Sequence, residues 1–233
     1  MRRLTTALGL LALVTLATPA TSSAQQSLNF HLGGFVPTGE DARGDIDGGD
    51  VLNNNLDFLL FNISDFNGAT VGAEYLVALN DYVEAGLGIS FYRRTVPTIY
   101  ADLVNENGTE IEQDLKLRIT PFTATVRFLP AGRTAAFVPY IGAGVGIFNW
   151  RYTETGDWVD SNDNIFRDTF RGSGTSTGPV VMGGLRVPFD TWDFGGEIKW
   201  QRAFGDLPSS ENFSADRINL GGFTYAATLN IHF

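Results

Sequence analysis

Eight charged side chains recur inside segments of otherwise uncharged residues, and they are the first candidates for chemistry. They stand at polar positions of segments in which apolar and polar residues alternate: Glu74, Glu84, Lys116, Arg118, Arg127, Arg186, Glu197 and Lys199. Charges that are removed from water need partners of opposite sign, so we expect glutamate–arginine and glutamate–lysine pairs. Such a network would be either a structural plug or a gated ion path, and the plug is favoured.

The two histidines, His31 and His232, are the candidates for acid–base catalysis. An acyl-transfer site would place a histidine beside a serine and a carboxylate. Both histidines occupy polar positions near the two ends of the mature chain. An acyl-transfer site in a membrane would lie near the outer leaflet, whereas His232 would lie at the opposite, inner side. The sequence therefore predicts no catalytic residues and no enzyme.

Two acidic runs have oxygen ligands at spacings that can hold calcium. One contains Asp45, Asp47 and Asp50, and the other spans residues 160–164. Neither matches the twelve-residue calcium loop, which requires glycine at its sixth position and glutamate at its twelfth. Solvated loops are the favoured interpretation, with weak calcium binding at the first run as the alternative. We expect no resident metal and no cofactor.

The composition excludes several classes of protein. The chain has no cysteine, which excludes a disulfide scaffold and a thiolate metal site. From its formal net charge of −10 we expect no basic face for the phosphates of a nucleic acid, so nucleic acid is not an expected partner. After the N-terminal segment no run reaches about 18 apolar residues, so no transmembrane helix is expected.

Residues 1–24 have the pattern of a secretory signal peptide. A basic start, Met1-Arg2-Arg3, precedes an apolar run from Leu8 to Leu16, and small residues end at Ala24. The run is shorter than the roughly 20 residues that a transmembrane helix needs. A buried N-terminal helix is the alternative. We expect cleavage after Ala24, which leaves residues 25–233 as one domain.

The mature chain alternates with a period of two, which is typical of β-strands. From Ala69 to Leu79, and again from Val83 to Phe91, every second residue is apolar, and Asn80-Asp81 forms a tight turn between the two runs. The opposite face consists of glycine, serine and isolated charges. This pattern fits a narrow polar interior with an apolar face toward lipid, although a soluble sandwich also alternates.

Eight such segments are present, and the connections between them are of two kinds, short turns and long loops. Short turns follow the second, fourth and sixth segments. Long acidic loops follow the first, third, fifth and seventh, at about 37–67, 95–113, 154–175 and 205–216. In the fourth segment, Asp114–Leu129, the apolar face shifts across Thr120-Pro121, which predicts a β-bulge. Alternating loop lengths favour an eight-stranded antiparallel up-and-down transmembrane β-barrel over a sandwich.

The last segment ends in a pattern that matches the signal read by the barrel-assembly machinery. Tyr225, Leu229, Ile231 and Phe233 share its apolar face. With the segments 139–146 and 183–186, this ending resembles the OmpA-like family of small outer-membrane β-barrels. The resemblance implies location in the bacterial outer membrane and contact with outer-membrane lipid and lipopolysaccharide. No peptidoglycan-binding domain follows the barrel, so a role in tethering the cell wall is not carried over.

The favoured function is a structural and surface-interaction role in which the barrel exposes four acidic extracellular loops. A narrow channel for small solutes or ions is the alternative, and an enzyme that modifies outer-membrane lipid is a distant third. The apolar segment 56–66 would either extend the second strand above the membrane or form a docking patch. The sequence leaves the ligand and the oligomeric state open.

Overall fold

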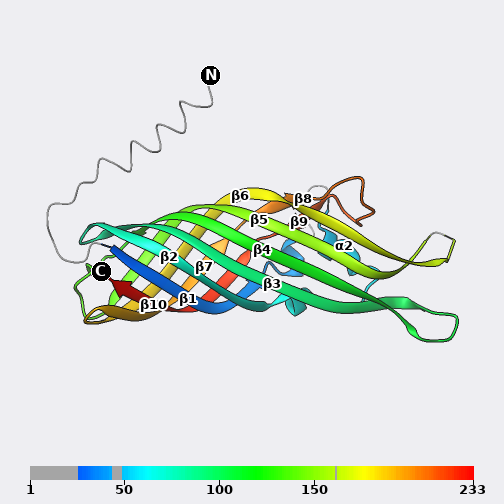
Figure 1. Cartoon of the computed structure of the whole chain (residues 1–233), viewed down its shortest axis with the longest axis horizontal. Coiled ribbons are helices and arrows are strands. Elements are labelled where there is room, and N and C mark those ends of the chain that lie inside the picture. Colours follow the sequence, from blue (N-terminus) through cyan, green and yellow to red (C-terminus); the bar gives the residue numbers. More distant parts are fainter. Residues whose placement is uncertain (1–25, 44–48, 161) are drawn as a thin grey trace, which may run out of the picture.

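A closed barrel of eight antiparallel strands forms the body of the molecule in a computed structural model (Figure 1). The structure describes residues 26–43, 49–160 and 162–233. The predicted signal peptide and cleavage site lie outside these residues, as do Asp45 and Asp47 of the candidate calcium site. The fold class predicted from the alternating segments is confirmed.

The strands pair with their neighbours in the chain, and the last strand closes the ring against the first. The barrel strands are β1 Gln26–Pro37, β2 Gly68–Asn80, β3 Val83–Val104, β4 Glu110–Phe128, β5 Val138–Val159, β6 Ile165–Phe189, β7 Trp192–Gln201 and β10 Gly222–His232. Between β7 and β10 lies a small hairpin of β8 Phe204–Asp206 and β9 Arg217–Asn219. Between β1 and β2 lie three short helices, η1 Glu40–Ala42, α2 Val51–Asn55 and η2 Ile63–Phe66.

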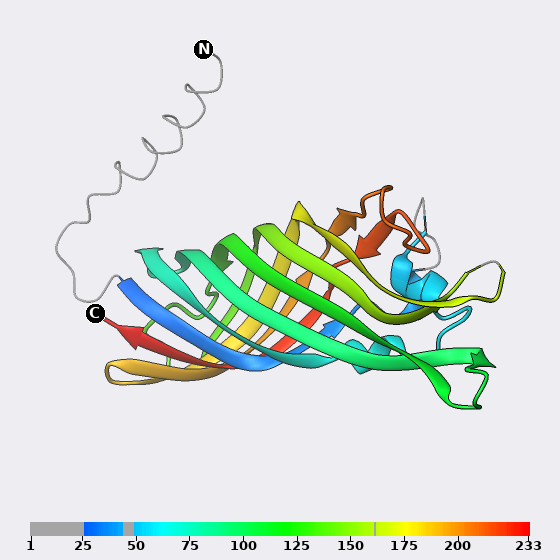
Figure 2. The ribbon, with the colours of Figure 1, turned by 45° about the vertical axis from the view of Figure 1, so that its right-hand side comes forward.

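The barrel has a turn end and a loop end. The turn end carries both described chain ends and the connections 81–82, 129–137 and 190–191, and the loop end carries the others. Strands β3 to β6 run far beyond the rest of the wall at the loop end (Figures 1 and 2). The loops predicted at 95–113 and 154–175 are therefore mostly strand. The connecting segments are only 105–109, between β3 and β4, and 160–164, between β5 and β6.

No bulge interrupts β4. Its register with β5 is continuous from Gln113 opposite Gly156 to Phe128 opposite Ile141, so the bulge predicted at Thr120-Pro121 is wrong. Alternation is preserved along the strand, and the polarity of its two faces reverses instead. Apolar side chains face outward on the turn-end half of β4 and inward on the loop-end half.

An apolar band surrounds the outside of the turn-end half. Every strand that passes through it contributes an apolar residue that is 48–66% exposed: Leu32, Val71, Leu87, Phe122, Ile141, Val181, Phe194 and Tyr225. Exposed aromatic residues line its edge at the turn end: Tyr82, Phe128, Phe137, Phe189, Trp192 and Phe233. A band of this kind with an aromatic edge suits the hydrocarbon and interface of a bilayer. Within the described residues, no helix is long and apolar enough to cross a membrane.

The loop-end half contains the apolar core. Inward residues of the long strands, such as Leu115, Leu117 and Trp150, pack against Leu52 and Phe66 of the β1–β2 connection. Figure 2 shows this connection, with α2, at the loop end beside the long strands. The segment 56–66 supplies Leu59, Ile63 and Phe66 to this core, so most of it neither extends a strand nor forms an exposed patch. We call residues 49–67 the apolar plug.

Candidate functional site: the closed interior and the outer wall

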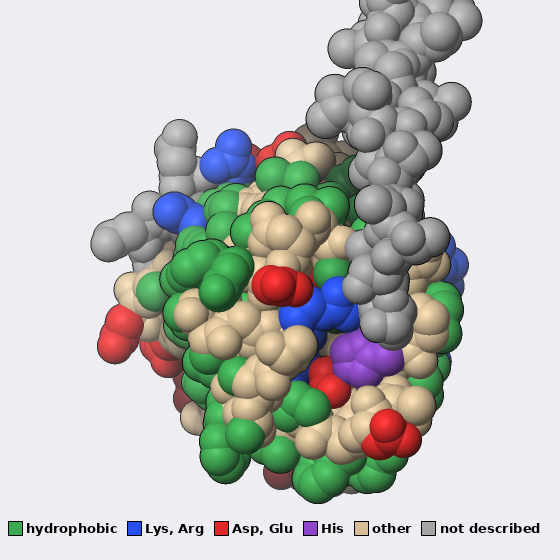
Figure 3. Space-filling model, turned by 90° about the vertical axis from the view of Figure 1, so that its left-hand side faces the viewer, with side chains coloured by type: hydrophobic (Ala, Val, Ile, Leu, Met, Phe, Trp, Pro, Cys, Tyr) green, Lys and Arg blue, Asp and Glu red, His purple; other side chains and the backbone are tan. Residues whose placement is uncertain are grey.

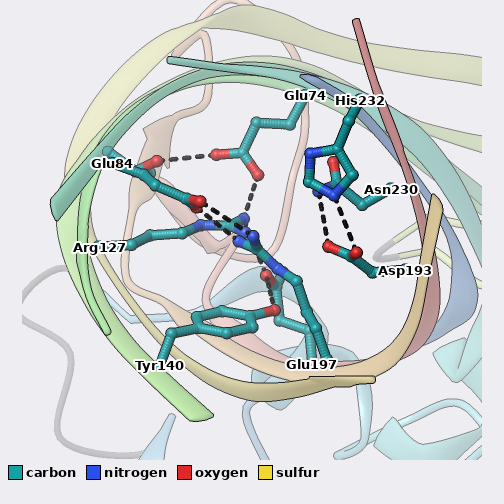
Figure 4. Close-up of polar contacts among 10 residues, drawn as sticks. Glu74, Glu84, Arg127, Tyr140, Asp193, Glu197, Asn230 and His232 are labelled. Atoms are coloured by element: carbon teal, nitrogen blue, oxygen red, sulfur yellow. Dashed lines mark hydrogen bonds and ion pairs between the residues drawn. The ribbon is translucent and has the colours of Figure 1, made fainter. Parts of the chain in front are cut away.

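The turn-end half of the interior is filled by charged residues from several strands (Figure 4). Six of the eight predicted residues meet there: Glu74, Glu84, Arg127, Arg186, Glu197 and Lys199. Three are acidic and three are basic, so the formal charges cancel. We call these six residues the charged plug. Because every member is at most 7% exposed, the cluster excludes bulk water from the centre of the barrel.

Arg127 links Glu74 to Glu197 and so forms the first part of the charged plug. Its Nη2 donates to Glu74 and, at 2.9 Å, to Oε2 of Glu197. Thr125 Oγ1 donates to the other oxygen of Glu74 at 2.7 Å, and Lys199 Nζ lies 3.2 Å from Oε1 of Glu197. Both carboxylates therefore have charged partners, which is what burial requires of them.

Arg186 and Glu84 form the second part of the plug. Two guanidinium nitrogens of Arg186 donate to the two oxygens of Glu84, at 3.2 and 2.8 Å. The ring of Tyr140 lies 4.8 Å from the guanidinium carbon of Arg127 and 4.7 Å from that of Arg186. Its hydroxyl donates to Glu197 at 2.9 Å. Cation–π contact and hydrogen bonding therefore join the two parts.

Inward glycines make room for these long side chains. A Cβ at Gly86 would lie 2.4 Å from Oε1 of Glu74, and one at Gly184 would lie 2.4 Å from the hydroxyl oxygen of Tyr140. An eight-stranded barrel is only wide enough to be filled by side chains, so large residues need small ones opposite. The glycines on the polar face of the strands thus provide the space that the charged plug and Tyr140 occupy.

The two histidines belong to separate groups. His232 Nε2 lies 2.8 Å from Oδ1 of Asp193, whose other oxygen accepts from Asn230 at 3.1 Å. This group lies at the turn end, where acidic, basic and histidine side chains gather inside a ring of apolar and uncharged residues (Figure 3). His31 Nε2 instead lies 3.1 Å from Ser90 Oγ. In the described contacts no carboxylate joins the His31–Ser90 pair.

A small cavity beside His31 separates the charged plug from the apolar core. Its volume is about 20 Å³, and Thr70, Ser90 and Lys199 are among its lining residues. A polar space of this size holds about one water molecule. The interior at this level is therefore too narrow for a hydrated solute.

A buried ion pair fixes the apolar plug at the loop end. Arg43 Nη1 donates to both oxygens of Asp50 at 2.8 and 2.9 Å, and both side chains are fully buried. Asp50 also caps α2 by accepting from the backbone of Leu52 and Asn53, and it accepts from the backbone N–H of Asn219 at 2.6 Å. These partners already occupy the oxygens of Asp50, which argues against the weak calcium site considered as the alternative there.

Glu154 is a buried carboxylate without a cationic partner in the described contacts. It lies on β5 well beyond Ile147, the last exposed apolar residue of that strand, and is 2% exposed. Asn55 of α2 donates to its Oε1 at 2.7 Å, and the Tyr152 hydroxyl donates to the same oxygen at 2.9 Å. Burial outweighs both hydrogen bonds and raises the pKa of Glu154 to about 7. Sequence analysis missed this residue because it assigned it to a loop.

Lys116 and Arg118 do not face the interior, so this part of the predicted network is wrong. With no bulge in β4, their neighbours Leu115 and Leu117 are completely buried, and both charged residues lie on the outer wall. Together with one residue each from β3, β5 and β6 they surround a groove of about 550 Å³. We call these five cations the basic wall: Arg93, Lys116, Arg118, Arg151 and Arg171.

A sequence signal for the basic wall does exist. Arg93 and Arg151 share the parity of the apolar residues Phe91 and Ile147 on their own strands. A charge at an outward position directly after an apolar run marks the place where the lipid-facing surface ends. Parity identifies outward charges as well as inward ones, but only the inward charges were predicted as a site.

Three residues of the predicted assembly signal lie on the outer face of β10, and the fourth, Phe233, directly follows the strand. Tyr225, Ile231 and Phe233 are 50%, 40% and 62% exposed, and Leu229 is partly exposed. The backbone N–H of Phe233 donates to Gln26 at 3.1 Å, where the last strand closes on the first. These side chains extend the apolar band to the turn end.

Comparison with known proteins gives structural matches only. No protein-family model matches the chain, and no curated protein matches it. Among solved structures, the outer membrane protein OprG of Pseudomonas aeruginosa is similar with a TM-score of 0.53 at 12% identity, over 91% of this chain and 97% of OprG. Neisserial surface protein A has a TM-score of 0.47 at 11% identity, over 91% and 100%.

Identities this low show the fold alone, and the fold agrees with the closed strand order and the exposed apolar band. The chain has the fold of the small eight-stranded outer-membrane β-barrels of Gram-negative bacteria, and its exposed apolar band suits a bilayer.

Proposed function

We propose that this protein is a closed outer-membrane barrel that stabilises the membrane and acts through its cell-surface face. The observation that carries this proposal is the closure of the interior at two levels. The charged plug fills the turn-end half, and the apolar plug fills the mouth at the loop end. Each level alone would block a hydrated solute.

The exposed hairpin tips support a role at the surface. Acidic residues there are solvent-exposed, among them Asp102, Glu106, Asp163 and Asp168. Acidic groups close to anionic lipopolysaccharide repel it unless cations lie between them. The tips are therefore suited to extend away from the lipid and to meet cationic or polar ligands.

A narrow channel is the second candidate and has less support. It would need a continuous path past Arg127 and Tyr140, whose side chains are at most 2% exposed. A lipid-modifying enzyme would need a histidine, a serine and a carboxylate together. The His31–Ser90 pair and the His232–Asp193 pair lie in separate groups.

Conductance in planar bilayers tests the proposal. We expect the folded full-length barrel to show no steady single-channel current in potassium chloride, whereas a wide porin in the same bilayers gives one. A variant with the apolar plug, residues 49–67, replaced by a glycine–serine linker should also remain silent, because the charged plug is still present. Steady current from the wild-type barrel would overturn the proposal in favour of the channel.

A further inference from the structure

The basic wall lies directly above the apolar band on the outer face of β3 to β6. On β3, Arg93 is the next outward residue after Phe91. On β4 and β5, Arg118 and Arg151 are the second outward residues beyond Phe122 and Ile147. Each outward step on a strand tilted by about 45° adds roughly 5 Å of height. The three guanidinium groups therefore stand at the depth of lipid head groups.

The register brings like charges together across neighbouring strands. Arg93 is directly opposite Arg118, and Arg118 is directly opposite Arg151. Lys116 and Arg171 both flank Thr153 in the next row. Like charges in directly opposed positions destabilise a sheet. Five of the 16 basic residues of an acidic chain are gathered at this one groove.

Compensating acids are scarce at the groove. Among the described residues that line it, Asp114 is the only acidic one. Among the described ion pairs, none joins a cation of the basic wall to a carboxylate. By contrast, Arg167 and Arg217 at the same end each pair with an aspartate. The wall is therefore complementary to an anion that comes from outside the chain.

We propose that the basic wall is a binding site for the phosphorylated head group of lipopolysaccharide. The arginines would bind lipid A phosphates through charge-assisted, bidentate hydrogen bonds. Thr95 and Thr153, which also line the groove, offer hydroxyl groups to the sugar. The acyl chains would lie on Phe91, Phe122 and Ile147 below.

Continuity with the apolar band favours a lipid over free phosphate. The groove opens on the outer wall, and the apolar band begins within one or two outward residues of its arginines, so one amphipathic molecule can contact both surfaces. The site extends the proposed function, and it rests on that function only in placing the loop end at the cell surface. Lipopolysaccharide would then neutralise the repulsion within the wall.

Retention of lipid by the folded barrel in detergent tests the site. Native mass spectrometry would count bound bis-phosphorylated lipid A on the wild type, on Arg118→Gln/Arg151→Gln and on Arg167→Gln/Arg217→Gln. Both double variants remove two positive charges at the loop end, and heat-modifiable migration would verify their folding. We expect at least about tenfold weaker retention only for Arg118→Gln/Arg151→Gln, because two charge-assisted contacts are lost.

Three further probes separate the sources of the anion. Dephosphorylated lipid A and phosphatidylglycerol should be retained weakly, and inorganic phosphate at millimolar concentration should not displace lipid A. Equal retention by both double variants would overturn the site, as would equal retention of dephosphorylated lipid A or phosphatidylglycerol, or displacement by phosphate. Conductance of the barrel, which tests the proposed function, is independent of all these results.

Discussion

The interior is governed by the pairing of individual charges. Arg127 has two carboxylate partners, Glu74 and Glu197, whereas Arg186 is paired with Glu84 alone in the described structure. Removing one member of a buried pair leaves the other without compensation, which costs about 3–5 kcal/mol. The two arginines should therefore respond differently to the loss of an acid.

We predict that Glu84→Gln lowers the free energy of unfolding in lipid vesicles by about 3–5 kcal/mol. Glu74→Gln should cost less, because Arg127 keeps Glu197. Urea titration followed by tryptophan fluorescence would measure both. Glu112→Gln, at an exposed position of β4, is the control and should change stability by no more than about 0.5 kcal/mol. Equal small effects of all three substitutions would indicate a wide, hydrated interior.

Glu154 makes the docking of the apolar plug dependent on pH. Its pKa rises from 4.5 to about 7 when the plug is docked, so the docked state favours the protonated form. The stability is therefore complete below about pH 4.5 and falls as the pH rises to 7, by up to about 3 kcal/mol. Other ionisable groups near Glu154 are Tyr152 and Tyr100, whose pKa values are both raised by burial, and Asp50, which is paired with Arg43.

Hydrogen exchange should show this dependence in residues 49–67. After correction for the intrinsic effect of pH, protection should be greater at pH 5 than at pH 8. Glu154→Gln should remove most of the difference, because glutamine stays neutral and can still accept from Asn55. Glu112→Gln should leave it unchanged. A pH dependence that persists in Glu154→Gln would assign the effect to another group.

At the scale of elements, one strand can serve two environments. The outward face of β4 carries Phe122 and Phe128 in the apolar band but Lys116 and Arg118 above it. The inward face changes in the opposite sense, from Arg127 to Leu115 and Leu117. The strand keeps its period of two, and only the surroundings of each face change along its length.

The last strand, β10, carries the prediction about assembly. We expect Phe233→Ser to lower the yield of folded barrel in cells, because the strand would lose the terminal residue of its proposed assembly signal. Heat-modifiable gel migration measures the folded fraction. Phe128→Ser is a matched control, since Phe128 is also exposed near the turn end at 49%. Equal folded fractions for the two variants would argue against a special role of the terminus.

At the scale of the whole molecule, charge is arranged in layers along the barrel axis. A neutral, paired cluster fills the turn-end interior, a basic wall stands above the apolar band, and acidic residues occupy the exposed hairpin tips. This order suits a protein whose loop end faces an anionic leaflet and the medium beyond it. The orientation is the prediction on which the surface role depends.

Labelling of introduced cysteines tests this orientation, since the native chain has none. Asn107→Cys lies in the exposed tip between β3 and β4, and Thr134→Cys lies in the exposed turn between β4 and β5. A membrane-impermeant maleimide should label Asn107→Cys on intact cells. It should reach Thr134→Cys only after the outer membrane is permeabilised. The reverse pattern would place the turn end outside.

The sequence alone determined the eight strands, their antiparallel order and most of the charged plug. Alternation is a local property, so Glu74 and Glu84 can be assigned to one face from their positions next to a tight turn. Pairs of these acids with arginine or lysine could be expected because few basic residues share the inward parity. Lys116 and Arg118 failed because the sequence analysis assumed that apolar residues face outward along the whole strand.

Only the tertiary structure decided at which residue of each strand the apolar side chains stop facing outward and begin to face inward. A face is apolar toward lipid or toward a core, and the choice depends on whether a residue lies inside or above the membrane band. The apolar plug fills the loop-end interior and thereby makes Leu115 and Leu117 core residues. The contacts that hold it, such as Arg43 with Asp50 and Asn55 with Glu154, depend on how the chain returns to the barrel mouth. No local pattern specifies that return, because it follows from closure of the entire sheet.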